Sequence, residues 1–471
     1  MYLSIGYVAK LLPEDNKKLQ DLIDVYNFHI NKNLEKTKYY EGHIPLSEVN
    51  LGIALPQGLR QLEIGCEWGG KCVDVLAARS MFDGFVGSNG EAPEKLNKIV
   101  IGNRLISEYM KACRDELKFG CTFATLSADK TIGAKIRFHS PETAACMWNG
   151  EKGRIDCGFA VIDTVPDEKD KNKWSPSIIN FYTDNYIIVI KKNPLTGLWS
   201  AEYNAHRLGR PMIEALVWNP TSDKPFGRSR IKEPIRRLIQ SYIRTIANAT
   251  IGLEFATSPQ KYLLGVTEDQ YDAVVNQKFQ QYVGSIITST TNPETGEKPS
   301  FGQLQQGSIT PHVEMIRILA TQFSAATGLT VMDTGVVNNA NPTSSDAILA
   351  QSKTLVLLAE ELNKANGDAL NMIARMAVAI LENKSLGELE DAEEDFIAHF
   401  KNPAMPSVAV TTDAAIKLAS ARENFGQTDT FLEMVGFDSA DIRRIKAQER
   451  RARGQALLEE TLGENFEKRV E

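Results

Sequence analysis

One stretch of the sequence constrains the fold more than any other, because residues 232–257 carry an apolar stripe at the spacing of a single long α-helix. Pro234 fits the first turn of a helix and would break an interior, so regular helix is expected to begin near Lys232. At about 1.5 Å per residue this helix would span roughly 39 Å, about twice the mean helix length. The length suggests an element that crosses a large assembly. The stripe consists of Ile235, Leu238, Ile239, Tyr242, Ile246, Ala249 and Leu253.

A second helix is expected over residues 311–328, because Pro311 again fits a first turn and Gly328 stops the apolar pattern. Between the two helices lies a small β-containing segment of about fifty residues, with a turn at 292–296. This order predicts an antiparallel helix pair with a small insertion at its tip.

The rest of the chain predicts a mixture of helices and strands. Residues 120–220 contain short β-rich runs separated by turns, which is typical of an antiparallel meander. Pro403 and Pro406 mark a boundary, and the tail from Thr411 is helical. The pattern predicts an α+β fold, and 471 residues suffice for roughly three domains. Other helices are expected over most of the first 30 residues and over 59–78, 99–117 and 345–382.

Composition narrows the possible functions. The net charge of −7 argues at face value against a protein that grips nucleic acid, which is usually basic. No apolar run approaches 18 residues and the N-terminus lacks a basic region, so neither a membrane span nor a signal peptide is expected. No two of the six cysteines have C-x-x-C spacing. They are interpreted as buried, reduced thiols, and no metal site is expected.

No catalytic motif is complete. Residues 65–71 match the spacing of a phosphate-binding loop, but Cys72 stands where a hydroxyl must hold Mg²⁺. We therefore interpret this stretch as a helix or turn with Trp68 and Val73 facing a core. Residues 87–90 are one residue short of a nucleophile elbow. The six histidines are scattered, and no cofactor is expected.

Arginines are regularly spaced on the long helix. Arg237 and Arg244 are seven residues apart and stack along one face, with Arg236 beside them. Arg230 continues the spacing only if the helix starts before Pro234. Two readings stay open, a solvated basic face and a stripe that meets a neighbouring subunit or DNA. Glu233 lies four residues before Arg237 and is expected to pair with it.

Short motifs occur in a fixed order along nearly the whole chain. The N-terminal ones are residues 39–42, 62–65, 73–79 and 82–85. The central and C-terminal ones are residues 226–231, 255–265, 322–329, 341–348, 411–417 and 435–437. In this order and spacing they resemble the phage portal protein family, in the branch found in long-tailed siphophages.

The resemblance implies a ring at one vertex of a capsid, usually of twelve subunits. Double-stranded DNA would enter through it, without sequence specificity, and leave at infection. The implied partners are the terminase large subunit, the major capsid protein, a head-completion or adaptor protein and possible scaffolding protein, with no membrane. The implied location is the virion, after assembly in the bacterial cytoplasm. The implied divisions are a wing (1–225), a first stem helix with its approach (226–257), a clip (258–308), a second stem helix (309–328), a tunnel loop (329–345), a wing return (346–405) and a helical crown (406–471).

Three groups of residues are singled out as functional within this plan. The stem or subunit-interface group is Arg230, Glu233, Arg236, Arg237 and Arg244. The loop expected to face the DNA is Thr334, Gly335, Val336, Val337, Asn338, Asn339, Ala340 and Asn341, whose glycine and asparagines suit a flexible backbone. The basic cluster of the crown is Arg443, Arg444, Lys446, Arg450, Arg451 and Arg453, which would meet the genome or pair with Glu449, Glu459 and Glu460 of a neighbour.

A DNA conduit has to surround the duplex without holding it. Neutralising roughly 6–10 phosphates already gives strong, salt-dependent binding. We therefore expect a largely acidic lumen, for which a modest acidic excess is suitable. Two alternatives remain, another phage ring or shell component such as a head-completion or capsid protein, and a soluble enzyme without recognisable motifs.

Overall fold

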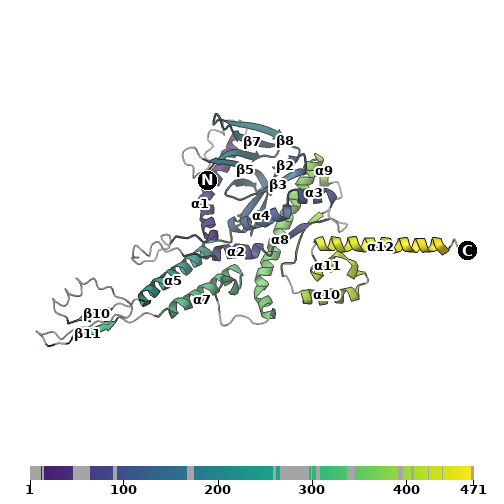
Figure 1. Ribbon diagram of the computed structural model, residues 1–471. Coiled ribbons are helices and arrows are strands. Elements are labelled where there is room, and N and C mark those ends of the chain that lie inside the picture. The colour runs from purple at the N-terminus through teal and green to yellow at the C-terminus, as the bar shows by residue number, and fades with distance from the viewer. Residues whose placement is uncertain are drawn as a thin grey trace.

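The computed structural model describes most of the chain (Figure 1). The described residues are 12, 15–45, 64–87, 93–166, 174–257, 261–265, 296, 298, 300–303, 308–336, 345–390, 396–404, 408–422, 424–437 and 439–467. Helices and strands are mixed throughout, which confirms the expected α+β class.

The larger sheet is a meander of five antiparallel strands in sequence order, β4 to β8. Ile188 and Ile190 alternate along β7 and share a core with Phe159 and with the N-terminal helix α1 (Asn16–Glu41). Tyr26 of α1 packs edge-on against Phe159, with ring centroids 5.6 Å apart. The meander predicted over 120–220 is therefore confirmed for residues 144–205, whereas the strands before and after them form a second sheet. Its strands are β4 (Ala144–Asn149), β5 (Arg154–Pro166), β6 (Trp174–Tyr182), β7 (Tyr186–Lys192) and β8 (Trp199–Ala205).

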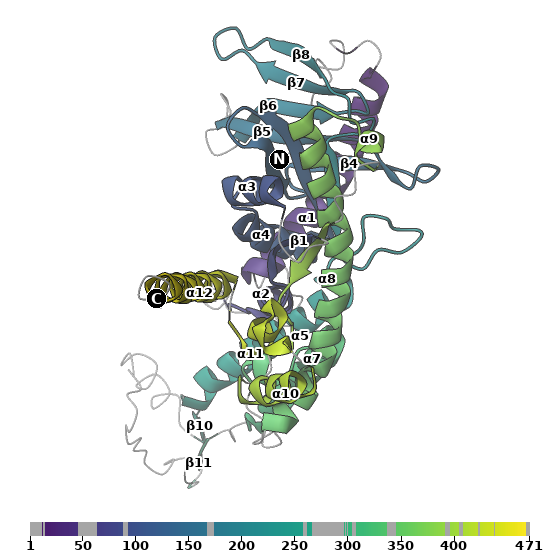
Figure 2. The same cartoon turned by 90° about the vertical axis from the view of Figure 1, so that its right-hand side faces the viewer.

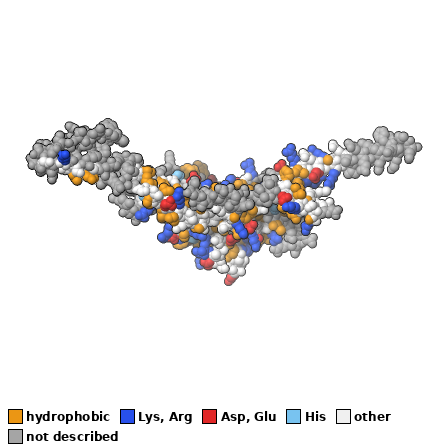
Figure 3. All heavy atoms as spheres, turned by 90° about the horizontal axis from the view of Figure 1, so that it is seen from below, with side chains coloured by type: hydrophobic (Ala, Val, Ile, Leu, Met, Phe, Trp, Pro, Cys, Tyr) orange, Lys and Arg blue, Asp and Glu red, His pale blue; other side chains and the backbone are white. Residues whose placement is uncertain are grey.

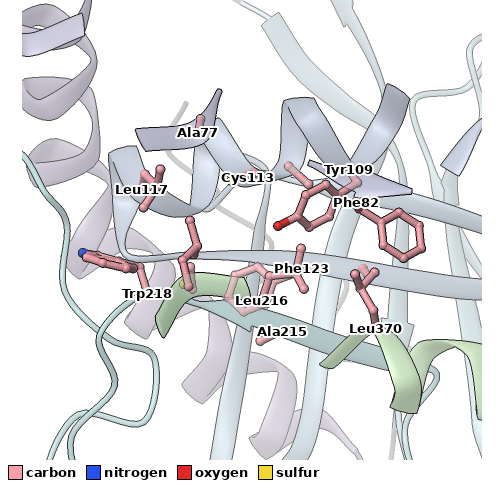
Figure 4. Close-up of a cluster of buried hydrophobic side chains, with 14 of the residues drawn as sticks. Ala77, Phe82, Tyr109, Cys113, Leu117, Phe123, Ala215, Leu216, Trp218 and Leu370 are labelled. Carbon is pink, nitrogen blue, oxygen red and sulfur yellow. The ribbon is translucent and has the colours of Figure 1, made fainter. Parts of the chain in front are cut away.

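A separate three-stranded sheet has the order β3-β2-β9, with β2 (Cys121–Asp129) between β3 (Gly133–His139) and β9 (Ile213–Val217). Helix α4 (Leu105–Phe119) packs on it through residues four apart, including Tyr109, Cys113 and Leu117 (Figure 4). Because these positions share one face of a helix, burying them creates a continuous apolar layer against the strands.

The helix expected over 99–117 is two helices, which corrects that prediction. Helix α3 (Glu94–Gly102) ends before α4 begins, and Arg104 between them has a left-handed φ of 50°. The Asn103 side chain donates to the carbonyls of Ile99 and Ala134 and accepts from the Ile136 amide. The Asn103 side chain thus bonds the backbone of β3, and these bonds stabilise the break between α3 and α4.

Two further expectations near the N-terminus are also corrected. The helix expected over most of the first 30 residues is longer, because α1 continues through Glu41 and Gly42 caps it with a φ of 73°. The second helix, α2 (Trp68–Ala77), is shorter than the expected 59–78, whose first residues lie outside the described ones. Trp68 and Val73 are buried, so the core interpretation of the phosphate-loop-like stretch is confirmed.

Segments far apart in sequence close the body. Strand β1 (Phe82–Gly87) pairs antiparallel with β12 (Phe396–Phe400), and Phe82 packs against Phe400 with ring centroids 5.7 Å apart. Helix α8 (Ser345–Glu382), confirmed at its predicted bounds, runs along one side of the body and packs on both β12 and the three-stranded sheet (Figure 2). A short helix α9 (Leu386–Glu390) follows it.

The predicted helix pair extends from this body (Figure 1). Helix α5 (Glu233–Thr257) leads away and α7 (Thr310–Thr327) returns beside it, while β10 (Lys261–Leu264) and β11 (Ser300–Gln303) pair antiparallel at the far end. Both helix starts agree with the predictions from Pro234 and Pro311 to within two residues. A 3₁₀ turn, η4 (Met332–Thr334), follows α7.

The C-terminal part is helical, as predicted. Helix α10 (Val408–Ala421), the 3₁₀ turn η5 (Phe425–Gln427) and helix α11 (Asp429–Val435) form a small group. Helix α12 (Ser439–Glu467) then projects away from the body (Figures 1 and 2). None of the described helices is long and apolar enough to span a bilayer.

Candidate functional site

At the base of the α5–α7 pair, both helices contact α2. The indole of Trp68 lies between one aromatic ring from each helix. Its centroid is 4.3 Å from that of Tyr242 on α5 and 4.8 Å from that of Phe323 on α7. Trp68 Nε1 also donates to the Thr334 carbonyl at 3.1 Å. One residue of α2 thus contacts α5, α7 and the turn that follows α7.

Arg230 makes the second connection at this base. The segment before α5 is held against the end of α4, where the Arg230 amide donates to the Leu117 carbonyl and the Ser229 hydroxyl to the Lys118 carbonyl. The Arg230 side chain is 7% exposed, and it donates from Nε to the Cys72 carbonyl at 2.5 Å and from Nη2 to the Thr327 carbonyl at 2.6 Å. Thr327 ends α7, where the helix dipole favours a cation.

This position corrects the expectation for Arg230. Arg230 precedes α5, so it does not continue the stripe of Arg237 and Arg244. Burial lowers the pKa of its guanidinium. Inside the subunit, the backbone carbonyls of Cys72 and Thr327 stabilise its charge.

The other predicted stem residues lie on α5, with different surroundings. Arg237 pairs with Glu233 at 2.5 Å, which confirms the predicted ion pair, and both side chains are exposed. Arg236 turns toward α1, with Nε 3.6 Å from Glu35 Oε1 and its guanidinium 5.9 Å from the Tyr39 ring. Arg244 is exposed one heptad beyond Arg237. The structure therefore brings Arg237 and Arg244 to an exposed face of α5 and separates Arg236 and Arg230 from it.

The predicted DNA-facing loop is described only at its start. Thr334 and Gly335 belong to a hydrogen-bonded turn, because their amides donate to the Val331 and Met332 carbonyls at 3.1 and 3.0 Å. Asp333 Oδ2 accepts from both the amide and the hydroxyl of Thr330, at 2.8 Å each. The loop thus begins as an ordered turn. Val336 is described and partly buried against the core, whereas Val337, Asn338, Asn339, Ala340 and Asn341 lie outside the described residues.

The predicted basic cluster lies on the first half of α12. Lys446 pairs with Asp429 of α11 at 2.5 Å, and Ile442 is buried beside it. The five arginines are exposed, and they are Arg443, Arg444, Arg450, Arg451 and Arg453. The Lys446–Asp429 pair joins the first turns of α12 to α11.

A buried polar chain joins α4 to α8. Ser80 bonds the Tyr109 hydroxyl and donates to Asn363 Oδ1, both at 2.6 Å. The Asn366 amide donates to the Tyr109 hydroxyl at 3.0 Å and to Glu116 Oε2 at 2.8 Å. Burial raises the pKa of Glu116 to about 8, so this carboxyl is protonated at neutral pH. Glu116 Oε1 and Asn366 Oδ1 have no hydrogen-bond partner among the described residues.

A metal site is usually built from histidine, cysteine, aspartate and glutamate side chains that lie close together. The described residues contain no cluster of these side chains that could hold a metal ion. All six cysteines are buried and unpaired, as predicted, and burial raises the pKa values of Cys66 and Cys72 to about 12. Such thiols are protonated and inert at neutral pH.

Sequence reasoning assigned Trp68 to core packing alone and did not predict its contacts with α5, α7 and the turn after α7. Its partners lie 174, 255 and 266 residues away, at Tyr242, Phe323 and Thr334. The available signal was an aromatic residue within an expected helix, beside two glycines that allow close approach. That signal indicates burial and does not identify the partners.

Comparison with known proteins places the chain in a family. The model of the family "Phage portal protein, SPP1 Gp6-like" matches residues 29–455. No curated protein matches significantly. Among solved structures, a chain of the virion of the native gene transfer agent particle has a TM-score of 0.46 and 10% identity, over 83% of this chain and 88% of the other. A chain of the native particle's neck, computed with C12 symmetry, has a TM-score of 0.44 and 11% identity, over 79% and 89%. A chain of the empty particle's neck, computed with C6 symmetry, has a TM-score of 0.46 and 12% identity, over 81% and 95%.

The family match spans the body, the α5–α7 pair and the C-terminal helices, in the order that the sequence motifs indicated. The chain belongs to the phage portal protein family of the SPP1 Gp6-like type.

Proposed function

We propose that this portal protein forms a ring whose central channel carries double-stranded DNA into the capsid and out of it. The observation that carries the proposal is the antiparallel α5–α7 pair, which extends from the body with the β10–β11 hairpin at its end. In the proposed assembly this pair is the stem and the hairpin belongs to the clip. The sheets with α8 make the wing, and α10 to α12 make the crown.

The charges support a conduit more than a tight binder. The net charge is −7, and basic and acidic side chains are interspersed over the described central part of the face in Figure 3. Few closely spaced cations on a wall limit the number of phosphates held at one time, so the duplex can slide. Arg237 and Arg244 are proposed to lie at the lumen or at a subunit contact, and the segment 334–341 is proposed to approach the DNA.

The proposed partners follow from a place at a capsid vertex. They are further copies of this chain, about twelve in a ring, with the major capsid protein, the terminase large subunit and a head-completion or adaptor protein. A scaffolding protein is a further candidate. The proposed location is the virion, after assembly in the host cytoplasm. We propose no catalytic activity and no cofactor.

Native mass measurement and particle images of the purified protein test the proposal. We expect a closed ring of about twelve copies with a central channel. A single monomer peak with no rings at any salt concentration would favour the soluble-enzyme alternative. A shell or a ring without the paired stem helices would favour a capsid or head-completion protein.

A further inference from the structure

The turn that begins the proposed DNA-facing loop is held in two ways. Within the turn, Asp333 bonds Thr330, and the amides of Thr334 and Gly335 bond carbonyls three residues earlier. From outside, Trp68 Nε1 donates to the Thr334 carbonyl, and among the described residues it is the one hydrogen-bond donor that reaches 330–336 from another element. The turn keeps its own shape, but that bond contributes to its placement.

Trp68 itself has a fixed position relative to the body. A β-carbon at the adjacent Gly69 would overlap the carbonyl oxygen of Tyr39, so α2 lies directly against the end of α1. Cys72 lies four residues after Trp68, and its carbonyl accepts a hydrogen bond from the buried Arg230, which also donates to the carbonyl of Thr327 at the end of α7. The indole is 4% exposed. Its N–H therefore projects from a rigid element toward Thr334.

We propose that Trp68 is the positioning residue of the DNA-facing loop, so that α2 as well as α7 sets where the loop starts. The inference rests on the proposed function, because it concerns the 334–341 segment. The indole also fills the space between Tyr242 and Phe323. A change in the separation of α5 and α7 therefore displaces the same group that holds Thr334. Trp68 links the spacing of the stem helices to the position of the loop.

The hydrogen bond can be removed without changing the shape of the side chain. Replacing Trp68 with 3-benzothienylalanine puts sulfur in place of the indole N–H and keeps the aromatic contacts to Tyr242 and Phe323. The matched control is the same replacement at Trp199, which packs in the other core cluster. Trp68→Phe is a second variant, accessible by ordinary mutagenesis, which keeps an aromatic ring but also leaves a void.

Hydrogen exchange of the assembled protein is the primary measurement. One lost hydrogen bond corresponds to about a 2- to 10-fold increase in local opening. We expect this increase for amides of 331–336 in the Trp68 analogue, with residues 310–327 of α7 unchanged and no effect from the Trp199 analogue. A side chain that only fills the core would give identical exchange in the analogue and the parent. Unchanged exchange at 331–336 would overturn the inference.

A measurement of DNA packaging by capsids that contain the same variants separates this inference from the proposed function. Faster exchange at 331–336 together with a changed packaging rate supports both. Faster exchange with an unchanged packaging rate supports the positioning role of Trp68 and removes the DNA role of the loop. Trp68→Phe should reproduce the exchange change of the analogue, and exchange that rises equally along α7 in both variants would mean that Trp68 supports only the core.

Discussion

The base of the α5–α7 pair makes many buried contacts with the body of the subunit, whereas the described side chains of helix α12 make few. At the base, Trp68 and Arg230 join five chain segments through two aromatic contacts and three hydrogen bonds. Helix α12 is longer than α5, yet Ile442 is the one fully buried residue among its described side chains. An element that must keep its angle to the body is tied by buried polar and aromatic contacts. The described side chains of α12 show few such contacts, so we expect its placement to depend on neighbours in the proposed ring.

The strongest expected effect comes from Arg230 at the base. Arg230→Ala removes the side-chain donor to the buried carbonyl of Thr327 and one of the donors to the carbonyl of Cys72, which also lies within helix α2. Hydrogen bonds from charged groups contribute about 1.5–3 kcal/mol each, so the free energy of unfolding should fall by about 3–5 kcal/mol. Urea unfolding of the unassembled subunit measures it. Arg228→Ala, at an exposed neighbouring arginine, is the control and should change stability by about 0.5 kcal/mol or less. Equal effects of the two substitutions would show that the buried hydrogen bonds of Arg230 do not stabilise the base of the α5–α7 pair.

The buried carboxyl of Glu116 is expected to destabilise the body of the subunit when it ionises. Its pKa rises from 4.5 in the unfolded chain to about 8 in the folded one. Between these values the unfolded carboxyl ionises while the folded one stays protonated, so stability should fall as pH rises from 4.5 to 8. Glu116→Gln should flatten this dependence and raise stability at pH 8 by a few kcal/mol, on the order of 1.4 kcal/mol per pKa unit. Thermal unfolding of both proteins at pH 5 and pH 8 checks it. A parent protein that gains stability toward pH 8, relative to the variant, would contradict the protonated state.

Removal of α12 tests whether this helix contributes little to the stability of the subunit. A chain ending at residue 438 loses the Lys446–Asp429 pair and the burial of Ile442, but no other buried contact of its described side chains. We expect the unfolding temperature of the unassembled subunit to change by about 2 °C or less. Ring formation should suffer more than folding. A much larger thermal shift, matched by Ile442→Ala alone, would show that α12 belongs to the core of the subunit.

The smallest effect on subunit stability is expected for Arg237. Both Arg237 and Glu233 are exposed, so Arg237→Glu replaces a weak attraction by a weak repulsion and should cost about 0.5 kcal/mol. Ring assembly or DNA packaging should nevertheless weaken, because the proposal places this face of α5 at a subunit contact or the lumen. Mass photometry across a salt series follows assembly, with Arg237→Lys as the charge-preserving control. Unaltered assembly and packaging in Arg237→Glu would place this face in solvent.

Periodicity within one element was sufficient to predict the helix pair and α8. Pro234 and Pro311 located the helix starts, and the apolar spacing of 345–382 gave α8 at its observed bounds. These features depend on neighbours along the chain, which the sequence displays directly. The break at Arg104 was missed because it depends on hydrogen bonds from Asn103 to residues more than thirty positions away.

Contacts between distant segments account for most of what the sequence could not reveal. Nothing local indicates that Phe82 pairs with Phe400, or that Trp68 reaches Thr334. The spacing of Arg230 with Arg237 suggested one stripe, but a helix start at Glu233 places Arg230 on the preceding segment, where it turns inward. A candidate site built from regular spacing therefore fails at the boundary of the element that carries it.

The most direct test of the central claim is a cryo-EM map of the assembled protein at side-chain resolution. The account predicts a closed ring in which α5 and α7 of every subunit surround the channel and Thr334 begins a segment that approaches its axis. A ring with the α5–α7 pairs and residues 334–341 on its outer rim would contradict the account.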